Sequence, residues 1–287
     1  MNLHEFDITR RYPATLVSSE RITPDNWEAE VRHLVLKLPE GAINYLEGQS
    51  IGVLPPGPRE FGNPYHLRLY SIASPREGEN LSGSTISICV RRCFYIDDIS
   101  GERYPGKASN YLCDAPPGET IQITGPYGSP FRVPSDETCN LLMVGVGTGI
   151  APFRALVKHI YDDHKGWKGK VRLFYGAKTG MELLYLNDIN NDLGLYYDQG
   201  SFQAFEALSP RPAFDALPAL DRVLAENSRE VWEMVQSPKT FVYLAGLLDA
   251  AQKFQNAMTI AAGSAETWQD THAQLVAEGR LSELLYE

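Results

Sequence analysis

The pattern of apolar residues changes about halfway along this chain, and this change constrains the fold more than any other feature. Residues 1–135 hold short strand-like runs that Gly and Pro interrupt, such as STISICVRRC and ETIQITGPYG. Short strands at close spacing favour a small antiparallel barrel or sandwich. Residues 136–287 alternate apolar runs with helical patterns, which favours a parallel sheet with helices on both faces. We place the boundary within the polar, Pro-containing stretch 131–140.

Length and charge narrow the function. The 287 residues suffice for two domains, and 43% apolar with 22% charged residues is typical of globular proteins. A formal net charge of −10 argues against nucleic-acid binding. The sequence shows no long apolar run and no signal-peptide pattern at its N-terminus, so we expect a cytoplasmic protein without a membrane span.

The four cysteines give no metal signature. Cys89, Cys93, Cys113 and Cys139 fit neither zinc nor iron–sulfur spacing. We therefore expect reduced thiols that serve as small core residues, and no resident metal.

A glycine-rich turn, GVGTGIAP, runs from Gly145 to Pro152 between an apolar run and a helical pattern. Glycines let a ligand approach the backbone, and a helix N-terminus attracts anions. The spacing matches neither a Walker loop nor the full G-x-G-x-x-G fingerprint, so the turn alone leaves a structural and a phosphate-binding role equally open. A second strand–Gly–helix turn at Gly246 favours a dinucleotide site.

Four blocks in order resemble plant-type ferredoxin–NADP(+) reductases: RLYSIAS (68–74), CVRR (89–92), GKASNYLCDAPPGETIQITGPYG (106–128) and GTGIAPFR (147–154). The resemblance spans nearly the whole chain. The stretches 182–193 and 205–212 look more like the reductase part of bacterial benzoyl-coenzyme A epoxidase, whose iron–sulfur domains have no counterpart here. The resemblance implies an antiparallel FAD-binding β-barrel (1–135) followed by an α/β NADP-binding domain (136–287). It also implies hydride exchange between NADPH and FAD, and single-electron exchange with a partner.

The resemblance assigns the flavin to the strand around residue 70. Arg68 would bind the FAD pyrophosphate, Tyr70 would lie against the isoalloxazine ring, and Ser71 would present its hydroxyl near the flavin N5. Strict alternation places Ser71 beside Leu69, which we expect to fill the barrel. We therefore expect the strand to bend or end near Tyr70, with Ser71 leaving the pleat.

The remaining FAD contacts come from two further blocks. Cys89 and Arg91 share a strand face; Arg91 would approach phosphate or ribose, and Tyr95 would stack on adenine. By themselves, Arg91 and Arg92 are more typical of a solvated pair than of a binding site. The pyrophosphate would be wrapped by Gly106, Lys107, Ala108 and Ser109. The glycine allows close approach, Lys107 and Ala108 offer backbone N–H groups, and Ser109 offers its hydroxyl.

The resemblance places the nicotinamide nucleotide on both glycine turns. Thr148, also assigned to FAD, and Gly149 would contact it, and Pro152 would set the helix start. Gly246 and Leu247 would line the nicotinamide side.

Ser209 and Arg211 resemble the Ser-Arg pair that binds the NADP 2′-phosphate, although Pro210 separates them where the family has adjacent residues. The Tyr and Lys that complete this pocket in the family have no clear match in 214–226. An Arg near the adenosine ribose still favours NADPH.

The C-terminal region departs from the family. Ala245 stands where the family has a Cys, and Leu284 where it has a Glu, with Glu283 one place off. Tyr286 matches the aromatic residue that covers the flavin, but Glu287 follows it. Tyr70, Ser71 and Tyr286 form the expected catalytic set, and we expect slower hydride transfer than in photosynthetic relatives.

The sequence is compatible with three functions. The first is an NADPH-dependent reductase of ferredoxin or flavodoxin, docked through a basic patch of Arg91, Arg92, Lys107 and Arg132. The second is the reductase component of an oxygenase or epoxidase system. The third is a redox sensor that binds flavin and nucleotide without turnover.

Overall fold

The computed structural model describes residues 6–57, 65–79, 83–163, 166–213 and 219–286. The chain forms two compact units. The first holds residues 1–130 together with 154–156, and the second holds 131–153 and 157–287. The second unit thus begins at Phe131, the first residue of the stretch in which we placed the boundary.

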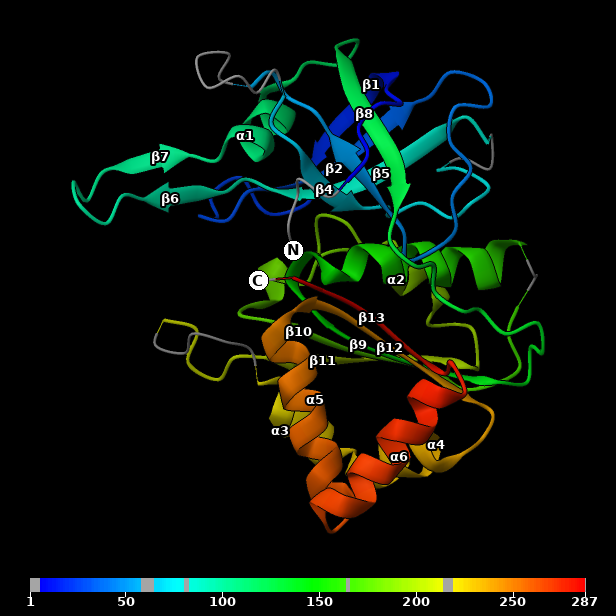
Figure 1. Cartoon of the computed structure of the whole chain (residues 1–287). Coiled ribbons are helices and arrows are strands. Elements are labelled where there is room, and N and C mark those ends of the chain that lie inside the picture. Colours follow the sequence, from blue (N-terminus) through cyan, green and yellow to red (C-terminus); the bar gives the residue numbers. More distant parts are fainter. Residues whose placement is uncertain (1–5, 58–64, 80–82, 164–165, 214–218, 287) are drawn as a thin grey trace. The chain divides into compact units, whose positions relative to one another are not determined.

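The first unit is an antiparallel barrel (Figure 1). Its strands are β1 (Tyr12–Arg21), β2 (Val31–Lys37), β3 (Ser50–Val53), β4 (Arg68–Ser71), β5 (Thr85–Arg91) and β8 (Thr120–Tyr127). They lie in the order β4-β3-β8-β1-β2-β5. A bridge between Ile72 and Ile88 joins the two ends of this order and closes the sheet. Alternate apolar residues from all six strands or their ends, among them Leu34, Ile51 and Ile123, fill the interior.

A hairpin and one helix complete this unit. Strands β6 (Phe94–Ile96) and β7 (Arg103–Pro105) pair with each other in a separate two-stranded sheet. Helix α1 (Lys107–Asp114) follows directly and contributes Leu112 and Cys113 to the barrel core. Figure 1 shows the hairpin projecting away from the barrel.

The second unit has a five-stranded parallel sheet in the order β11-β10-β9-β12-β13. The strands are β9 (Asn140–Val146), β10 (Val171–Ala177), β11 (Phe202–Leu208), β12 (Thr240–Leu247) and β13 (Leu281–Tyr286). Helix α2 (Ile150–Lys158) lies on one face in Figure 1. The other face carries α3 (Leu220–Glu226), α4 (Ser228–Gln236), α5 (Leu248–Ala261) and α6 (Ala265–Ala277). The central strands are buried on both faces, as their continuous apolar runs require.

Short helical turns connect these elements: η3 (Gly147–Gly149), η4 (His159–Asp163), η5 (Gly180–Glu182) and η6 (Leu193–Tyr196). The predicted fold class, an antiparallel barrel followed by a parallel-sheet α/β unit, is confirmed in both halves. Among the described residues, no helix is both long and apolar enough to cross a bilayer.

A buried ion network stabilises the first unit around Glu79. Its carboxylate accepts hydrogen bonds from Ser87 Oγ (2.6 Å) and from both terminal nitrogens of Arg154 (2.6 and 3.0 Å). His33 Nε2 lies 3.5 Å from the carboxylate. Burial alone would raise the pKa of Glu79, but the hydrogen bonds and charges of His33 and Arg154 outweigh it and hold the pKa far below its usual range.

This network sets a stability prediction. Glu79→Gln leaves a buried guanidinium without its carboxylate and should lower the free energy of unfolding by about 3 kcal/mol at neutral pH. Because the folded-state pKa is depressed, the stabilisation is present above the unfolded carboxyl pKa and is lost as pH falls toward the folded value. Urea unfolding at pH 7 and pH 4 measures both effects, with exposed Glu40→Gln as control. An equal loss of stability at both pH values would contradict the linkage.

Candidate functional sites

Strand β4 holds the predicted flavin residues, but Ser71 does not lie as we expected. The strand ends at Ser71, one residue after Tyr70, and Ser71 still pairs with Ser50 of β3. The next residue, Ile72, bridges to β5 and closes the barrel, which keeps the chain extended through Ser71. The expectation that Ser71 leaves the pleat is therefore wrong.

The faces of β4 are also exchanged relative to our expectation. Tyr70 shares its side with Ile72, and its ring packs half-buried against the barrel core, whereas Leu69 is not part of that core. Burial raises the pKa of the Tyr70 hydroxyl well above its usual value. Tyr70 is therefore a fixed, neutral aromatic surface at the edge of the core, while Ser71 lies on the opposite face of the strand.

Basic side chains gather beside the start of β4. Arg68 is exposed and donates to the carbonyl of Leu67 (2.9 Å). The pKa of His66 is lowered by partial burial and by the charges of Arg68 and Lys107. Arg68 and Lys107 therefore act on one locality, although 39 residues separate them in sequence, and a diphosphate would be favoured there.

The N-terminus of α1 lies against the link between β5 and β6. Gly106 precedes the helix and donates its N–H to Cys93 O (2.9 Å), and a Cβ at this position would lie 3.1 Å from that oxygen. Ser109 Oγ accepts the N–H of Cys93 (3.0 Å) and is buried. The Ser109 hydroxyl thus fastens the helix to the strand, whereas exposed Lys107 begins the helix.

Arg92, one of the four residues of the predicted basic patch, is engaged in ion pairs within the first unit. Arg92 donates to Glu30 (2.7 Å), Asn110 (2.9 Å) and Asp114 (2.8 Å), which ties α1 to the strands. Hydrogen bonds from its guanidinium to Asp114 and Glu30 raise the pKa of Arg92 further. Arg91, one residue earlier, is exposed. Arg92 is therefore a structural residue of the first unit.

Arg132, another residue of the predicted basic patch, belongs to the second unit, where it donates to the carbonyls of Glu278 (2.5 Å) and Gly279 (3.5 Å).

The interpretation of all four cysteines as core residues was wrong for one of them. Cys89, Cys113 and Cys139 are buried, but Cys93 is exposed. It follows the end of β5, where the chain leaves the barrel for the hairpin, so its side chain reaches solvent.

An aromatic pair marks the β6–β7 hairpin. Tyr95 lies opposite Tyr104, and their rings stack at 5.5 Å between centroids. Tyr95 is 57% exposed, which leaves an aromatic surface available to a planar ligand. Sequence reasoning identified Tyr95 and missed Tyr104, because the pairing depends on the hairpin register.

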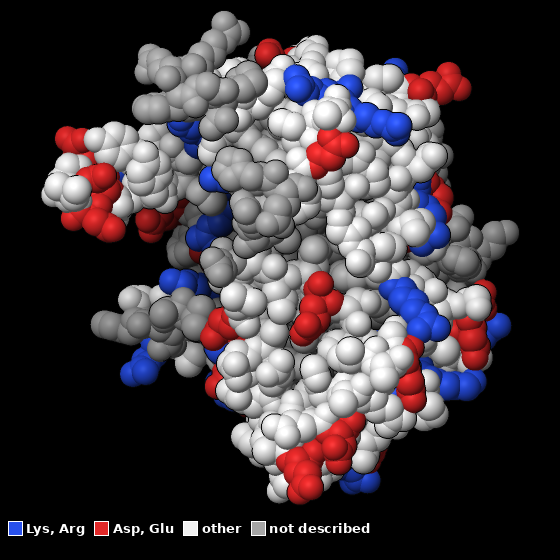
Figure 2. All heavy atoms as spheres, viewed as in Figure 1, with Lys and Arg blue, Asp and Glu red and all other residues white. Residues whose placement is uncertain are grey.

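The surface charge is mixed. Figure 2 shows acidic and basic side chains interspersed on the face of the molecule that it presents.

In the second unit, the two glycine turns pack against each other. Gly147 has φ 55°, and a Cβ there would enter open space, so its backbone is accessible. A Cβ on Gly149 would lie 2.4 Å from Ala245 O, and one on Gly246 would lie 2.7 Å from Val146 O. Tyr175 Oη, which sequence reasoning missed, donates to Gly147 O (2.8 Å) and holds the turn.

The other predicted nucleotide residues lie at the carboxyl edge of this sheet. Pro152 is the third residue of α2, where a missing N–H costs no helical hydrogen bond. Leu247 ends β12 and is 38% exposed. Ser209 directly follows β11 and is buried, and Arg211 is exposed. Of the stretch searched for further phosphate ligands, residues 214–218 lie outside the described part of the chain.

Tyr286 meets the first glycine turn. It ends β13, is 39% exposed, and its hydroxyl lies 2.8 Å from Thr148 Oγ1. Two residues earlier, Leu284 is the register partner of Ala245 in β12. The two departures from the family are therefore neighbours across one strand pair. Glu287 lies outside the described residues.

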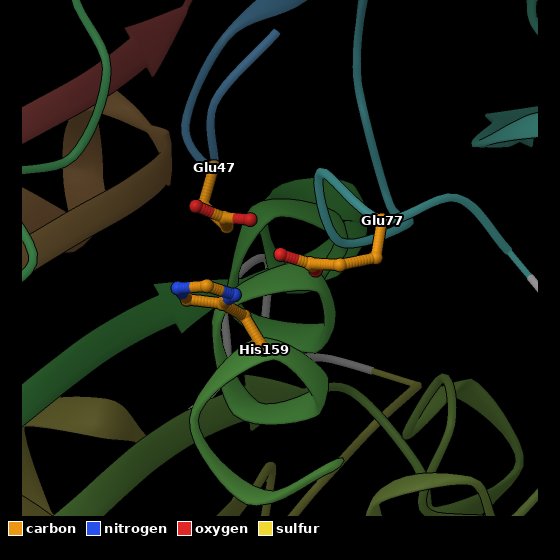
Figure 3. Close-up of side chains that lie close together, drawn as sticks. All are labelled: Glu47, Glu77 and His159. Atoms are coloured by element: carbon orange, nitrogen blue, oxygen red, sulfur yellow. The ribbon is translucent and has the colours of Figure 1, made fainter. Parts of the chain in front are cut away.

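Two carboxylates of the first unit, Glu47 and Glu77, point toward each other (Figure 3). Glu47 accepts the backbone N–H of Arg76 (2.9 Å) and also forms an ion pair with the Arg76 guanidinium. A carboxylate neutralised in this way is a poor ligand for a divalent cation. We assign no metal to this pair.

An antiparallel barrel followed by a parallel sheet with two glycine turns is the architecture expected of a two-domain, nucleotide-dependent oxidoreductase. Residues 143–256 match the family model described as "Oxidoreductase NAD-binding domain". The chain is 36% identical over 272 residues to ferredoxin–NADP reductase of Spirulina sp., covering 92% of this chain and 91% of that protein. The cyanelle enzyme of Cyanophora paradoxa is 36% identical, covering 93% and 74%.

Leaf isozyme 1 of Arabidopsis thaliana is 35% identical and covers 95% of this chain and 76% of that protein. The chain belongs to the ferredoxin–NADP reductase family. A solved structure of the Plasmodium falciparum reductase superposes with a TM-score of 0.75 over 98% of both chains at 18% identity, which supports the same fold.

Proposed function

We propose that this protein is a FAD-dependent oxidoreductase that exchanges a hydride with NADPH and single electrons with a ferredoxin-type protein. The observation that carries this function is the relationship to ferredoxin–NADP reductases along almost the whole chain, at 36% identity over 272 residues. The two groups of residues described above would provide the binding that such a reaction needs: Arg68 and Lys107 for a diphosphate beside the ring of Tyr70, and the two glycine turns for a second nucleotide.

The first unit fits FAD. Arg68, Lys107 and the first N–H groups of α1 would bind the pyrophosphate, while Tyr70 would support the ring. Ser71, Cys89 and Gly106 would line the cofactor. Ala108 and Ser109, buried residues of α1, would lie behind the residues that bind the pyrophosphate. Arg91 and Tyr95 would serve the adenosine end. Bound FAD supplies the conversion between two-electron and one-electron transfer; the protein residues bind and orient it.

The pyrophosphate assignment predicts a loss of FAD affinity. Arg68→Ala should weaken FAD binding to the apoprotein about tenfold or more, because a charge-assisted contact to the diphosphate disappears. Quenching of FAD fluorescence on titration measures this affinity. Lys37→Ala removes an exposed cation on β2 and should change nothing. Equal FAD affinity in wild type and Arg68→Ala would contradict the assignment.

The second unit fits NADPH. The accessible backbone at Gly147, with Thr148 and Gly149, would bind the nucleotide beside Gly246 and Leu247, and Pro152 opens the helix behind it. Thr148 would also border the flavin. Ser209 and Arg211 would bind the 2′-phosphate, which favours NADPH over NADH. Tyr286 would cover the flavin until the nicotinamide displaces it, because it lies at the turn that the nucleotide would use.

The identity of the electron partner is a separate part of this proposal. Ferredoxin is favoured by the relatives' names; flavodoxin or an oxygenase component, which the sequence around 205–212 suggested, are the other acceptors. NADPH-driven cytochrome c reduction that depends on added ferredoxin and weakens with salt would support electrostatic docking of an acidic partner. Reduction supported only by an oxygenase component would support the second function. Failure with every acceptor, despite bound FAD and NADPH, would favour a redox sensor and overturn the proposal.

A further inference from the structure

The register of two parallel strands places a lysine beside the predicted phosphate residues. Strands β10 and β11 stay paired to their carboxyl ends, where Ala177 is the partner of Leu208. The next residue on β10 is Lys178, and the next on β11 is Ser209. The two residues therefore leave the sheet side by side at its carboxyl edge, with Arg211 two residues further along.

Lys178 has the properties of an anion-binding side chain. It is exposed, and no ion pair involves it among the described residues. Most cations around it in sequence are engaged, since Lys170 and Arg172 at the amino end of the same strand both bind Glu230 (3.1 and 3.0 Å). Ligands of open parallel sheets bind at the carboxyl edge, where Lys178 lies.

Thr179, the residue after Lys178, provides independent evidence for a ligand at this edge of the sheet. Thr179 Oγ1 is buried and has no hydrogen-bond partner among the described residues. Buried hydroxyl groups almost always have a hydrogen-bond partner in native proteins. An unpaired one therefore marks a place where a polar group of a ligand would complete the hydrogen bonding. Thr179 precedes η5, directly after Lys178, so this incomplete hydrogen bonding lies at the same edge of the sheet.

We propose that Lys178 is a specificity-determining cation for the 2′-phosphate of NADPH, acting together with Ser209 and Arg211. A phosphate monoester carries a charge of about −1.5 to −2 at neutral pH, which one guanidinium does not balance. A lysine ammonium on the neighbouring strand provides the second positive charge. This inference rests on the proposed NADPH-dependent function and names the residue that selects the phosphorylated nucleotide.

The test compares two ligands that differ only in this phosphate: adenosine 2′,5′-bisphosphate and AMP. Isothermal titration of the FAD-loaded protein should show that Lys178→Ala weakens the bisphosphate about tenfold and leaves AMP unchanged. Lys178→Arg should retain most of the affinity. The matched control is Lys168→Ala, which removes a 73% exposed lysine three residues before the start of β10.

The outcomes separate this inference from the proposed function. If the wild-type protein prefers the bisphosphate and Lys178→Ala keeps that preference, the inference is overturned and the function stands. An equal loss for both ligands would also overturn it, because Lys178 would then act on a shared phosphate. If the wild-type protein does not distinguish the two ligands, the NADPH preference itself fails. Circular dichroism of each variant confirms that the fold is kept.

Discussion

Replacing Tyr286 with Ser should tighten NADP(+) binding about tenfold. The phenol ends β13 at the turn assigned to the nicotinamide, and its hydroxyl lies 2.8 Å from Thr148 Oγ1. A side chain that occupies the nicotinamide position for about nine-tenths of the time weakens the apparent affinity about tenfold, and removing it restores the intrinsic value. Deleting Tyr286 and Glu287 together should act in the same direction.

Difference spectra on titration with NADP(+) measure this affinity. Tyr286→Phe is the matched control, because it keeps the ring and removes the hydroxyl that lies 2.8 Å from Thr148 Oγ1, so its affinity should stay close to that of the wild type. Unchanged affinity in Tyr286→Ser would show that the ring does not compete with the nicotinamide. Tighter binding in both variants would assign the effect to the hydroxyl contact and not to the ring.

Restoring two polar groups at once should accelerate hydride transfer. Ala245 and Leu284 are register partners on β12 and β13, and they stand where the family has a Cys and a Glu. Ala245 is fully buried and Leu284 is half-buried, so this corner of the second unit is apolar. The wild-type protein should therefore transfer hydride more slowly than photosynthetic relatives, since groups that order the nicotinamide and move protons are missing.

Ala245→Cys with Leu284→Glu should raise the rate of flavin reduction about tenfold or more, with each single change giving less than half of the effect on a logarithmic scale. Stopped-flow reduction by NADPH measures the rates, and the double-mutant cycle measures the coupling. Ser282→Glu adds a carboxylate on the same face of β13 but nearer its start, so it is the control. A wild-type rate as high as that of photosynthetic relatives would contradict the account.

Local patterns in the sequence were sufficient to predict the fold class. Short runs interrupted by Gly and Pro fold into the barrel, and continuous apolar runs followed by helices fold into the parallel sheet. The two glycine turns were recognised from their strand–Gly–helix pattern, and Gly147 and Gly246 have the positive φ values, 55° and 117°, that glycine tolerates. Such features depend on residues close together in the chain, which is why they are visible without coordinates.

Features that depend on long-range pairing could not be predicted. The Ile72–Ile88 bridge that closes the barrel fixes Ser71 in the ladder, and alternation within one strand does not reveal it. Arg92 was interpreted as a docking residue because its partners Glu30 and Asp114 lie 62 and 22 positions away. The position of Lys178 beside Ser209 likewise follows only from the register of β10 with β11.

Anaerobic mixing of the FAD-loaded protein with NADPH decides whether this chain is a reductase. The visible absorbance of the oxidised flavin should bleach completely with NADPH, and more slowly with an equal concentration of NADH. With one equivalent of NADPH per flavin, an excess of oxidised ferredoxin should then restore the oxidised spectrum under argon, because each reduced flavin passes its two electrons singly to two ferredoxins. A protein that binds FAD and NADPH, as shown by titration, yet keeps its yellow colour would contradict the claim that this chain is a reductase.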